Sequence, residues 1–370
     1  MPQRKIIKQF QDIVIQIATP YSTGTGFYLA DQNIVVTNEH VVRDNREVVI
    51  EGVKIPKQLA KVVYLDQKYD LAFIHISGET NISEVNLAPN MDGLAQGQLV
   101  IAIGHPYGLP FAATQGILSN VMLEENGISF LQHDASLNPG NSGGPLINEA
   151  GEIIGVNTFI LKDGNNIGFS LPVNYLSQAI KEFKKGKDTP GVRCFSCLNV
   201  VFENEMTGRY CKYCGSSITM ISKLDLYEAI GISKTIEEML SNLGYSVELT
   251  RRGPNNWEIN KGSATITISY HEKSGLIIAD AFLCVLPKQN IKPLYEFLLR
   301  ENYQNDSLTF SVRNQDIIIS ILIYDQYLNA TTAIKLFQEL FIAADKYDDL
   351  LIEKFNARWK DDPSSEQSRN

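Results

Sequence analysis

Short β-branched segments recur along the first 172 residues of the chain. DIVIQIAT, EVVIEG and QLVIAIG are examples, and Gly, Asn and Pro separate such segments from one another. Many short strands at close spacing, with turn residues between them, predict an all-β sandwich or a pair of barrels. We therefore expect the N-terminal half of the chain to be an all-β unit.

A helix is expected to close this all-β unit. Pro172 precedes VNYLSQAIKEFKKGKD, in which the apolar residues fall at helical spacing and two lysines and a glycine end the pattern. This pattern places a domain boundary near residue 188, so that residues 1–188 form the first domain.

Two further domains are predicted beyond that boundary, which makes the fold class multidomain. Residues 189–221 contain four cysteines and almost no periodic hydrophobicity, so this segment cannot make a core of its own. Residues 222–358 combine helical patterns with strand patterns, including a strand around SVELTRR, and describe an α+β domain with one antiparallel sheet. Residues 359–370 are expected to form a disordered tail.

The composition is that of a globular protein, and its charge argues against two classes of partner. Of the 370 residues, 44% are hydrophobic and 20% are charged, and the formal net charge of -9 gives a pI of about 5.2. A field of this sign repels phosphate backbones and anionic membrane surfaces. No apolar run reaches the roughly 18 residues that a membrane span needs. We therefore expect neither nucleic acid nor a membrane as a partner.

The first residues and the cysteine usage together suggest a cellular location. The stretch MPQRKIIKQFQDIVIQIATP has no uninterrupted apolar segment and no small-residue cleavage site typical of secretory signals. Four of the five cysteines form two C-x-x-C pairs, which fit a metal site in a reducing compartment better than a disulfide framework. We expect a cytoplasmic protein.

The segment NPGNSGGPL, residues 138–146, raises the question of whether Ser142 belongs to an ordinary turn or is a nucleophile. Gly, Asn, Pro and Ser dominate turns, so this loop alone favours a turn. Acyl transfer by serine also needs a base and a carboxylate that orients the base. His40, in IVVTNEHVV, and Asp70, in KYDLAFIHI, each lie at the end of an apolar strand pattern, where a polar side chain can face a cleft. Their joint occurrence favours a His40–Asp70–Ser142 triad.

A set of motifs in fixed order supports the nucleophile interpretation. The motifs are GTGF (24–27), TNEHVV (37–42), YDLAFIHI (69–76), GHPYG (104–108), TQGILS (114–119), DASLNPGNSGGPLIN (134–148), GEIIGVNT (151–158) and IGFSLPV (167–173). Over roughly residues 10–185 the chain resembles the trypsin-like proteases of the high-temperature-requirement (HtrA/Deg) family. The resemblance implies two six-stranded β-barrels with the active site between them. It also implies that His40 is the general base, that Asp70 orients it, and that the N–H groups of Gly140 and Ser142 form the oxyanion hole.

The resemblance extends to substrate selection. By that resemblance Leu137 and Ile167 line the pocket for the residue before the scissile bond, and neither is charged. An apolar pocket gains about 0.8 kcal/mol for each CH₂ group that it buries and would leave a Lys or Arg unpaired. We expect cleavage of proteins or peptides after small aliphatic residues such as Val, Ile or Ala.

Four of the five cysteines have the spacing of a structural zinc site. Cys194, Cys197, Cys211 and Cys214 form the pattern C-x2-C-x13-C-x2-C, in which four thiolates match tetrahedral Zn²⁺ with no open position. We therefore expect a zinc ribbon with a structural Zn²⁺ ion. Residues 192–219 carry three basic and two acidic side chains, so no basic stripe favours nucleic-acid binding.

The third domain resembles the type III secretion chaperone-like (YbjN-like) fold in its order of elements and in stretches such as VLPKQNIKPLYEFLLREN. This resemblance implies a protein partner for the C-terminal domain, and a homo-oligomer is one form that such an association can take. The first hypothesis is thus a serine endopeptidase that has C-terminal modules for partner binding or regulation. The alternative is a catalytically silent scaffold or sensor in which the protease fold binds peptides or protein partners without cutting them.

Overall fold

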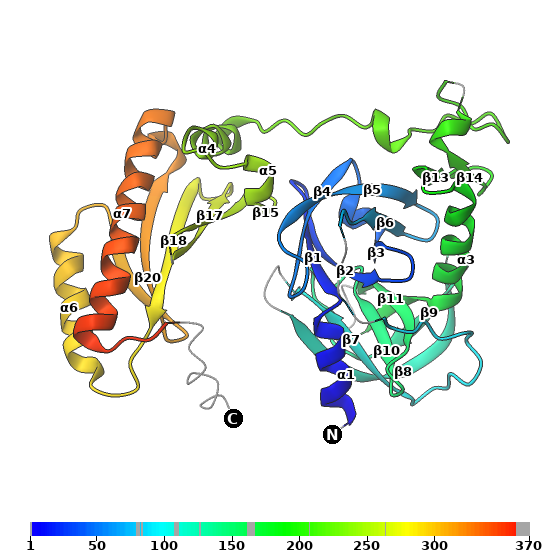
Figure 1. The fold of residues 1–370 in the computed structure, drawn as a ribbon, viewed down its shortest axis with the longest axis horizontal. Coiled ribbons are helices and arrows are strands. Elements are labelled where there is room, and N and C mark those ends of the chain that lie inside the picture. The colour runs from blue at the N-terminus through cyan, green and yellow to red at the C-terminus, as the bar shows by residue number, and fades with distance from the viewer. Residues whose placement is uncertain are drawn as a thin grey trace. The chain divides into compact units, whose positions relative to one another are not determined.

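Figure 1 shows the computed structural model of the chain. It describes residues 2–78, 82, 84–106, 111–125, 127–160, 167–206, 208–262 and 264–359. Residues 1–227 and 228–370 are two compact units, and each has a hydrophobic core of its own. Of the expected disordered tail, residues 360–370 lie outside the described residues.

The first barrel is built from β1 to β6 within the described part of the chain. The strands are β1 (Val14–Ala18), β2 (Thr23–Leu29), β3 (Ile34–Thr37), β4 (Glu47–Gly52), β5 (Gln58–Asp66) and β6 (Leu71–His75). They are hydrogen-bonded in the order β5-β4-β1-β2-β3-β6, and a further β5–β6 pairing closes the ring. Val and Ile fill its interior because β-branched side chains suit a pleated surface that is buried.

The second barrel closes in the order β10-β11-β12-β9-β8-β7. Its strands are β7 (Leu99–Gly104), β8 (Ala112–Glu125), β9 (Ile128–His133), β10 (Pro145–Asn148), β11 (Ile153–Ile160) and β12 (Gly168–Pro172). Together the two rings confirm the predicted pair of six-stranded barrels over the residues that the structure describes.

Among the described residues of the first unit, three α-helices accompany the barrels: α1 (Pro2–Gln11), α2 (Glu39–Val42) and α3 (Val173–Phe183). The sequence did not lead us to expect α1, which precedes β1 and buries Phe10 completely. Helix α3 begins directly after Pro172, as the sequence predicts, and buries the apolar side chains that fall at helical spacing. His40 was expected at the end of a strand, but it lies on α2, because β3 ends at Thr37 and Asn38 precedes a short helical turn.

The cysteine-rich segment is joined to the first barrel. Strands β13 (Gly191–Arg193) and β14 (Val200–Phe202) pair with each other, and β13 also pairs with β5 in parallel. Short 3-10 turns follow at Glu203–Glu205 and Ile221–Lys223. In Figure 1 this segment lies beside the end of α3. The buried cysteines Cys194 and Cys211 are part of the same hydrophobic cluster as the first barrel.

The second unit contains a mixed set of helices and one antiparallel sheet. The helices are α4 (Gly231–Asn242), α5 (Val247–Thr250), α6 (Ile291–Gln304) and α7 (Ala330–Phe355). The strands are β15 (Arg251–Gly253), β16 (Asn256–Lys261), β17 (Ala264–His271), β18 (Leu276–Val285), β19 (Thr309–Arg313) and β20 (Asp316–Tyr324), in the order β15-β16-β17-β18-β20-β19. Residues 247–250 were expected in a strand but form the short helix α5, in which the Thr250 hydroxyl donates to the Val247 carbonyl.

The long helix α7 packs on the sheet through residues such as Phe337 and Leu340, which are almost fully buried. Among the described residues, no helix combines the length and the apolar character that crossing a membrane requires.

Candidate active site

A histidine and an aspartate are hydrogen-bonded to each other on the first barrel. His40 Nδ1 lies 2.8 Å from Asp70 Oδ2, and the His40 backbone N–H donates to Asp70 Oδ1 over 3.0 Å. The two side chains are 39% and 26% exposed, so a substrate can reach them. Because one carboxylate holds both the backbone and the ring, the imidazole has a fixed orientation in which Nε2 is the nitrogen that can act as a base.

Ser142 lies in a tight loop that two glycines make possible. Gly140 and Gly143 have φ angles of 101° and 86°, in the region that favours glycine. A Cβ atom at Gly143 would lie 2.1 Å from the Thr25 carbonyl oxygen. The Thr25 N–H donates to the Ser142 carbonyl over 2.9 Å, and the Thr25 hydroxyl donates to the Gly140 carbonyl over 2.6 Å. Strand β2 therefore holds the serine loop against the first barrel.

The serine loop lies near the histidine segment, but the serine hydroxyl is hydrogen-bonded elsewhere. A Cβ atom at Gly143 would also lie 2.3 Å from Thr37 Oγ1, three residues before His40. The Ser142 hydroxyl donates to the Thr158 carbonyl over 3.1 Å. Among the described residues no hydrogen bond joins Ser142 to His40. The structure thus brings His40 and Asp70 together and places the Ser142 backbone beside their barrel.

Two backbone N–H groups in this loop have no hydrogen-bond acceptor within the described residues. These groups belong to Gly140 and Ser142, the pair expected to form the oxyanion hole. Backbone donors directed at a developing oxyanion are a large contribution to acyl transfer. Their availability is consistent with that role.

The residues expected to line the specificity pocket lie at the start of β12. Ile167 directly precedes β12 and is half-buried. A Cβ atom at Gly168 would lie 3.0 Å from Leu137 Cδ1 and 2.6 Å from His133 Cε1. Leu137 and the His133 ring therefore share the space over Gly168, which a side chain at this position would fill.

A chain of buried polar groups lies beneath that space. The Asn157 amide donates to the Ile103 and Pro145 carbonyls over 3.4 and 3.3 Å, which directs its Oδ1 at Ser170. The Ser170 hydroxyl donates to this oxygen over 3.0 Å, so it accepts from His133 Nε2, also at 3.0 Å. All three side chains are fully buried. Burial lowers the pKa of His133 to about 4, against smaller raising effects of the Ala135 backbone and the Asp134 charge.

Three further residues hold the site in place, and we did not predict a role for any of them. Thr25, Asn38 and Thr158 lie inside the motifs GTGF, TNEHVV and GEIIGVNT. Asn38 donates from its side-chain amide to the Asp70 carbonyl over 2.8 Å, while Thr158 accepts the serine hydroxyl. Their position within the motifs next to His40 and Ser142 was the available signal.

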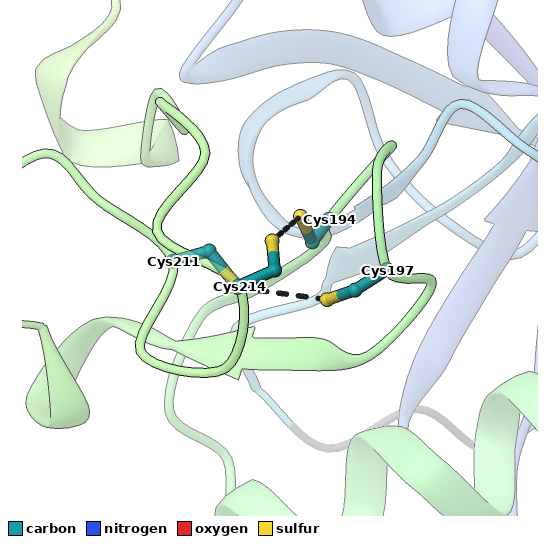
Figure 2. Close-up of side chains that lie close together, drawn as sticks. All are labelled: Cys194, Cys197, Cys211 and Cys214. Atoms are coloured by element: carbon teal, nitrogen blue, oxygen red, sulfur yellow. Dashed lines mark hydrogen bonds between the residues drawn. The ribbon is translucent and has the colours of Figure 1, made fainter.

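The four cysteines converge, as Figure 2 shows. Their sulfur atoms all lie within 4.8 Å of one another, and Sγ of Cys194 is 3.6 Å from that of Cys214 while Sγ of Cys197 is 3.7 Å from that of Cys211. Zn–S bonds of about 2.3 Å in a tetrahedron imply S–S separations of about 3.8 Å. Hydrogen bonds from Ser216 lower the pKa of Cys214 to about 6, whereas burial raises the pKa of Cys194 to about 11, so the thiolate form that metals bind is favoured at Cys214 but not at Cys194. The donor set is compatible with zinc.

Two barrels with a histidine–aspartate pair and a glycine-rich serine loop define the class of this part of the molecule. The family model described as a trypsin-like peptidase domain matches residues 24–156. The chain therefore contains a trypsin-like serine protease domain.

Individual relatives refine this class. A protein of Pseudomonas fluorescens named "Probable periplasmic serine endoprotease DegP-like" is 35% identical over 171 residues, which cover 45% of this chain and 36% of the relative. A protein of Buchnera aphidicola with the same name is 40% identical over 165 residues, which cover 42% and 35%. The solved structure of the serine endoprotease from Yersinia pestis is 29% identical, with a TM-score of 0.45, and the match covers 50% of this chain and 67% of that one. The protease domain is HtrA/DegP-like, while the chain spans little more than a third of the length of the two named relatives.

The expected cytoplasmic location is contradicted by these comparisons. Both DegP-like relatives are named as periplasmic proteins. The expectation relied partly on the thiol content, and that inference was weak, because cysteines that bind a metal are protected from disulfide formation in either compartment.

The buried His133 gives a testable pH dependence. Its folded-state pKa of about 4 is below the unfolded value of 6.5, so the unfolded chain binds more protons between these values. The contribution of His133 to the free energy of unfolding is therefore fully present above about pH 6.5. It is lost as the pH falls toward 4, by about 3 kcal/mol in total.

His133→Gln is the matched control, because its amide can still bond to Ser170 but does not titrate over this range. Chemical denaturation at pH 7 and pH 4 should show that the wild type loses about 3 kcal/mol more than this variant. Equal losses in the two proteins would show that His133 is charged in the folded state.

Proposed function

We propose that the chain is a serine endopeptidase in which Ser142 attacks the peptide carbonyl. The observation that carries this proposal is the His40–Asp70 hydrogen bond on a barrel to which the Ser142 loop is itself fastened by Thr25. The protease domain that the comparisons identify supports it. The activity of the whole chain, with its other modules, is part of the proposal.

The proposed reaction is acyl transfer, in which Ser142 is the nucleophile and His40 is the general base. The Ser142 hydroxyl rotates from the Thr158 carbonyl toward His40, and Nε2 takes its proton as the oxygen attacks. The N–H groups of Gly140 and Ser142 stabilise the oxyanion, and the imidazolium then gives its proton to the leaving amine. Water then attacks the acyl-enzyme while His40 takes its proton, and the imidazolium returns a proton to Ser142 as the acid product leaves. Asp70 stabilises the imidazolium and keeps Nε2 directed at the serine.

A second candidate is a protease fold that binds peptides without cutting them. The observation in its favour is the hydrogen bond from Ser142 to the Thr158 carbonyl, which engages the hydroxyl proton with a group other than the histidine. Labelling with a fluorophosphonate distinguishes the two candidates, because this reagent reacts only with a serine that a base activates.

Ser142→Ala tests the nucleophile. We expect a loss of kcat on the order of 10⁶-fold and complete loss of fluorophosphonate labelling, because the attacking oxygen is removed. Ser136→Ala, in the same loop, is the control and should retain labelling. Hydrolysis by Ser142→Ala at the wild-type rate would exclude Ser142 as the nucleophile.

We also propose that the enzyme prefers small aliphatic residues before the scissile bond. Leu137 supplies an apolar group beside Gly168, Ile167 is the partly buried residue directly before it, and His133 stays neutral near pH 7 because burial lowers its pKa to about 4. Such a pocket offers no partner for a cationic side chain.

A peptide panel that varies only this residue measures the preference. We expect kcat/KM for Val, Ile or Ala to exceed that for Lys or Arg at least about 100-fold, since a buried cation would remain unpaired. Leu137→Asp should lower kcat/KM for the aliphatic peptides. A preference of the wild type for Lys or Arg would contradict the proposal.

The cysteine cluster is proposed to hold one structural Zn²⁺ ion, with four thiolates and no position for substrate. Metal analysis of the purified chain should find about one zinc per molecule, which a chromogenic chelator releases. Cys214→Ser should reduce this content, while Cys284→Ser, at a buried cysteine of the second unit, should not. Equal zinc content in all three proteins would exclude the cluster as the site.

The C-terminal domain is proposed to bind a protein partner, and a second copy of this chain is one such partner. On α6 the side chains of Tyr295, Leu299 and Tyr303 are 43%, 69% and 91% exposed. Their four-residue spacing places them on one face of the helix. Exposed apolar groups that line one face are typical of interaction surfaces.

A further inference from the structure

A buried arginine lies at the junction between the first barrel and the cysteine-rich segment, residues 189–221, which we call the ribbon. Arg193 directly precedes Cys194 and is 5% exposed. It ends β13, which runs parallel to β5 with Gly191 opposite Tyr64 and Val192 opposite Leu65. The first strand of the ribbon is therefore an additional strand of the first barrel's sheet, and Arg193 emerges next to the end of β5.

The guanidinium of Arg193 binds the ribbon and the barrel at once. Its Nη1 donates to the Leu198 carbonyl over 2.6 Å, and Leu198 N–H in turn donates to the Cys194 carbonyl over 2.9 Å. Its Nε donates to Asp66 Oδ2 over 2.6 Å. Its Nη2 binds the Glu182 carboxylate on α3. The turn that runs from Cys194 to Leu198 thus supplies one of the contacts that hold this side chain.

Asp66 transmits that position to the next turn of the barrel. The carboxylate is fully buried, and its second oxygen, Oδ1, accepts the Tyr69 N–H over 3.1 Å. The Arg193 guanidinium also lies over the Tyr69 ring, 5.1 Å from its centre. The arginine therefore holds the turn that follows β5 by an ion pair with Asp66, the last residue of β5, and by a cation–π contact with Tyr69.

This turn ends at the carboxylate of the candidate active site. Asp70 follows Tyr69 directly, has a φ angle of 49°, and precedes the first residue of β6. Both of its carboxylate oxygens hold His40. A displacement of the turn would move Asp70 relative to His40, and misplacement by about 1 Å can cost on the order of 100-fold in rate.

We propose that Arg193 is a positioning residue that couples the metal-binding ribbon to Asp70, so that catalysis requires the ordered, metal-loaded ribbon. The proposal rests on the proposed function, since it assigns a regulatory input to that site. The ribbon takes no part in the chemistry. Loss of the metal releases the turn at Leu198, Arg193 loses one of its anchors, and the segment from Asp66 to Asp70 loosens.

Arg193→Lys tests the coupling because it keeps the charge but loses the fork that joins Leu198 to Asp66. We expect kcat to fall about 10- to 100-fold with KM little changed, because orientation rather than substrate binding is affected. Hydrogen exchange of the Tyr69 N–H should accelerate, and the downfield proton resonance of His40 Nδ1–H should weaken.

Glu182→Gln is the matched control. It keeps a hydrogen-bond acceptor for Arg193 and removes only a charge on α3, away from the turn that ends at Asp70, so kcat, Tyr69 exchange and the His40 resonance should stay at their wild-type values. If Arg193→Lys folds and leaves all three readouts unchanged, Arg193 is only a structural residue and the proposal is wrong.

Metal removal tests the same coupling in the unmodified chain, even if Arg193→Lys fails to fold. Chelation of the wild type should accelerate exchange across residues 66–70 and lower kcat to the level of the arginine variant. In Arg193→Lys, chelation should have little additional effect on either readout. Unchanged exchange across residues 66–70 after chelation would overturn the proposal. Because exchange is measured without substrate, this result stands even if the chain shows no peptidase activity and the proposed function fails.

Discussion

The candidate site depends on a single buried threonine at the seam between the barrels. Thr25 donates from its N–H to Ser142 and from its hydroxyl to Gly140, and its hydroxyl oxygen also accepts the His105 N–H. Its carbonyl accepts the Thr37 hydroxyl over 2.7 Å. The histidine and aspartate come from the first barrel, whereas the serine comes from the second. A residue that binds both sides through its backbone and side chain therefore fixes the separation on which their chemistry depends.

Asn157 holds the other side of the serine loop. Its carbonyl accepts the Gly143 N–H and its N–H donates to the Gly144 carbonyl, both over 2.8 Å. Its side chain begins the polar chain through Ser170 to His133. Buried polar groups are costly unless they are hydrogen-bonded, and the hydrogen bonds along this chain restrict the side chains of Asn157 and Ser170. The serine loop is thus hydrogen-bonded to Thr25 on one side and to Asn157 of β11 on the other, and the Asn157 side chain is itself held by Ser170.

The features that depend on neighbouring residues in the chain could be predicted from the sequence. Glycine and asparagine around Ser142 indicated the turn, and cysteine spacing indicated four converging thiols. The location of His40 on α2 was missed, because a single helical turn after a strand has too few residues to show a period. Arg193 was counted as one of several charges on the ribbon, but the structure buries it against Asp66, 127 residues away in sequence. No local pattern reports a pairing between segments so distant.

The way the ribbon attaches explains why it reaches the active site so directly. Strand β5 pairs with β6 along one edge, but on the other edge β4 pairs only with residues 58–61. The end of that edge, at Tyr64 and Leu65, is covered by β13. A strand that covers this edge must end beside Asp66, where the turn to Asp70 begins. An unpaired strand edge is a liability in any sheet, so the contact that protects the barrel also connects the ribbon to the Asp70 carboxylate of the candidate site.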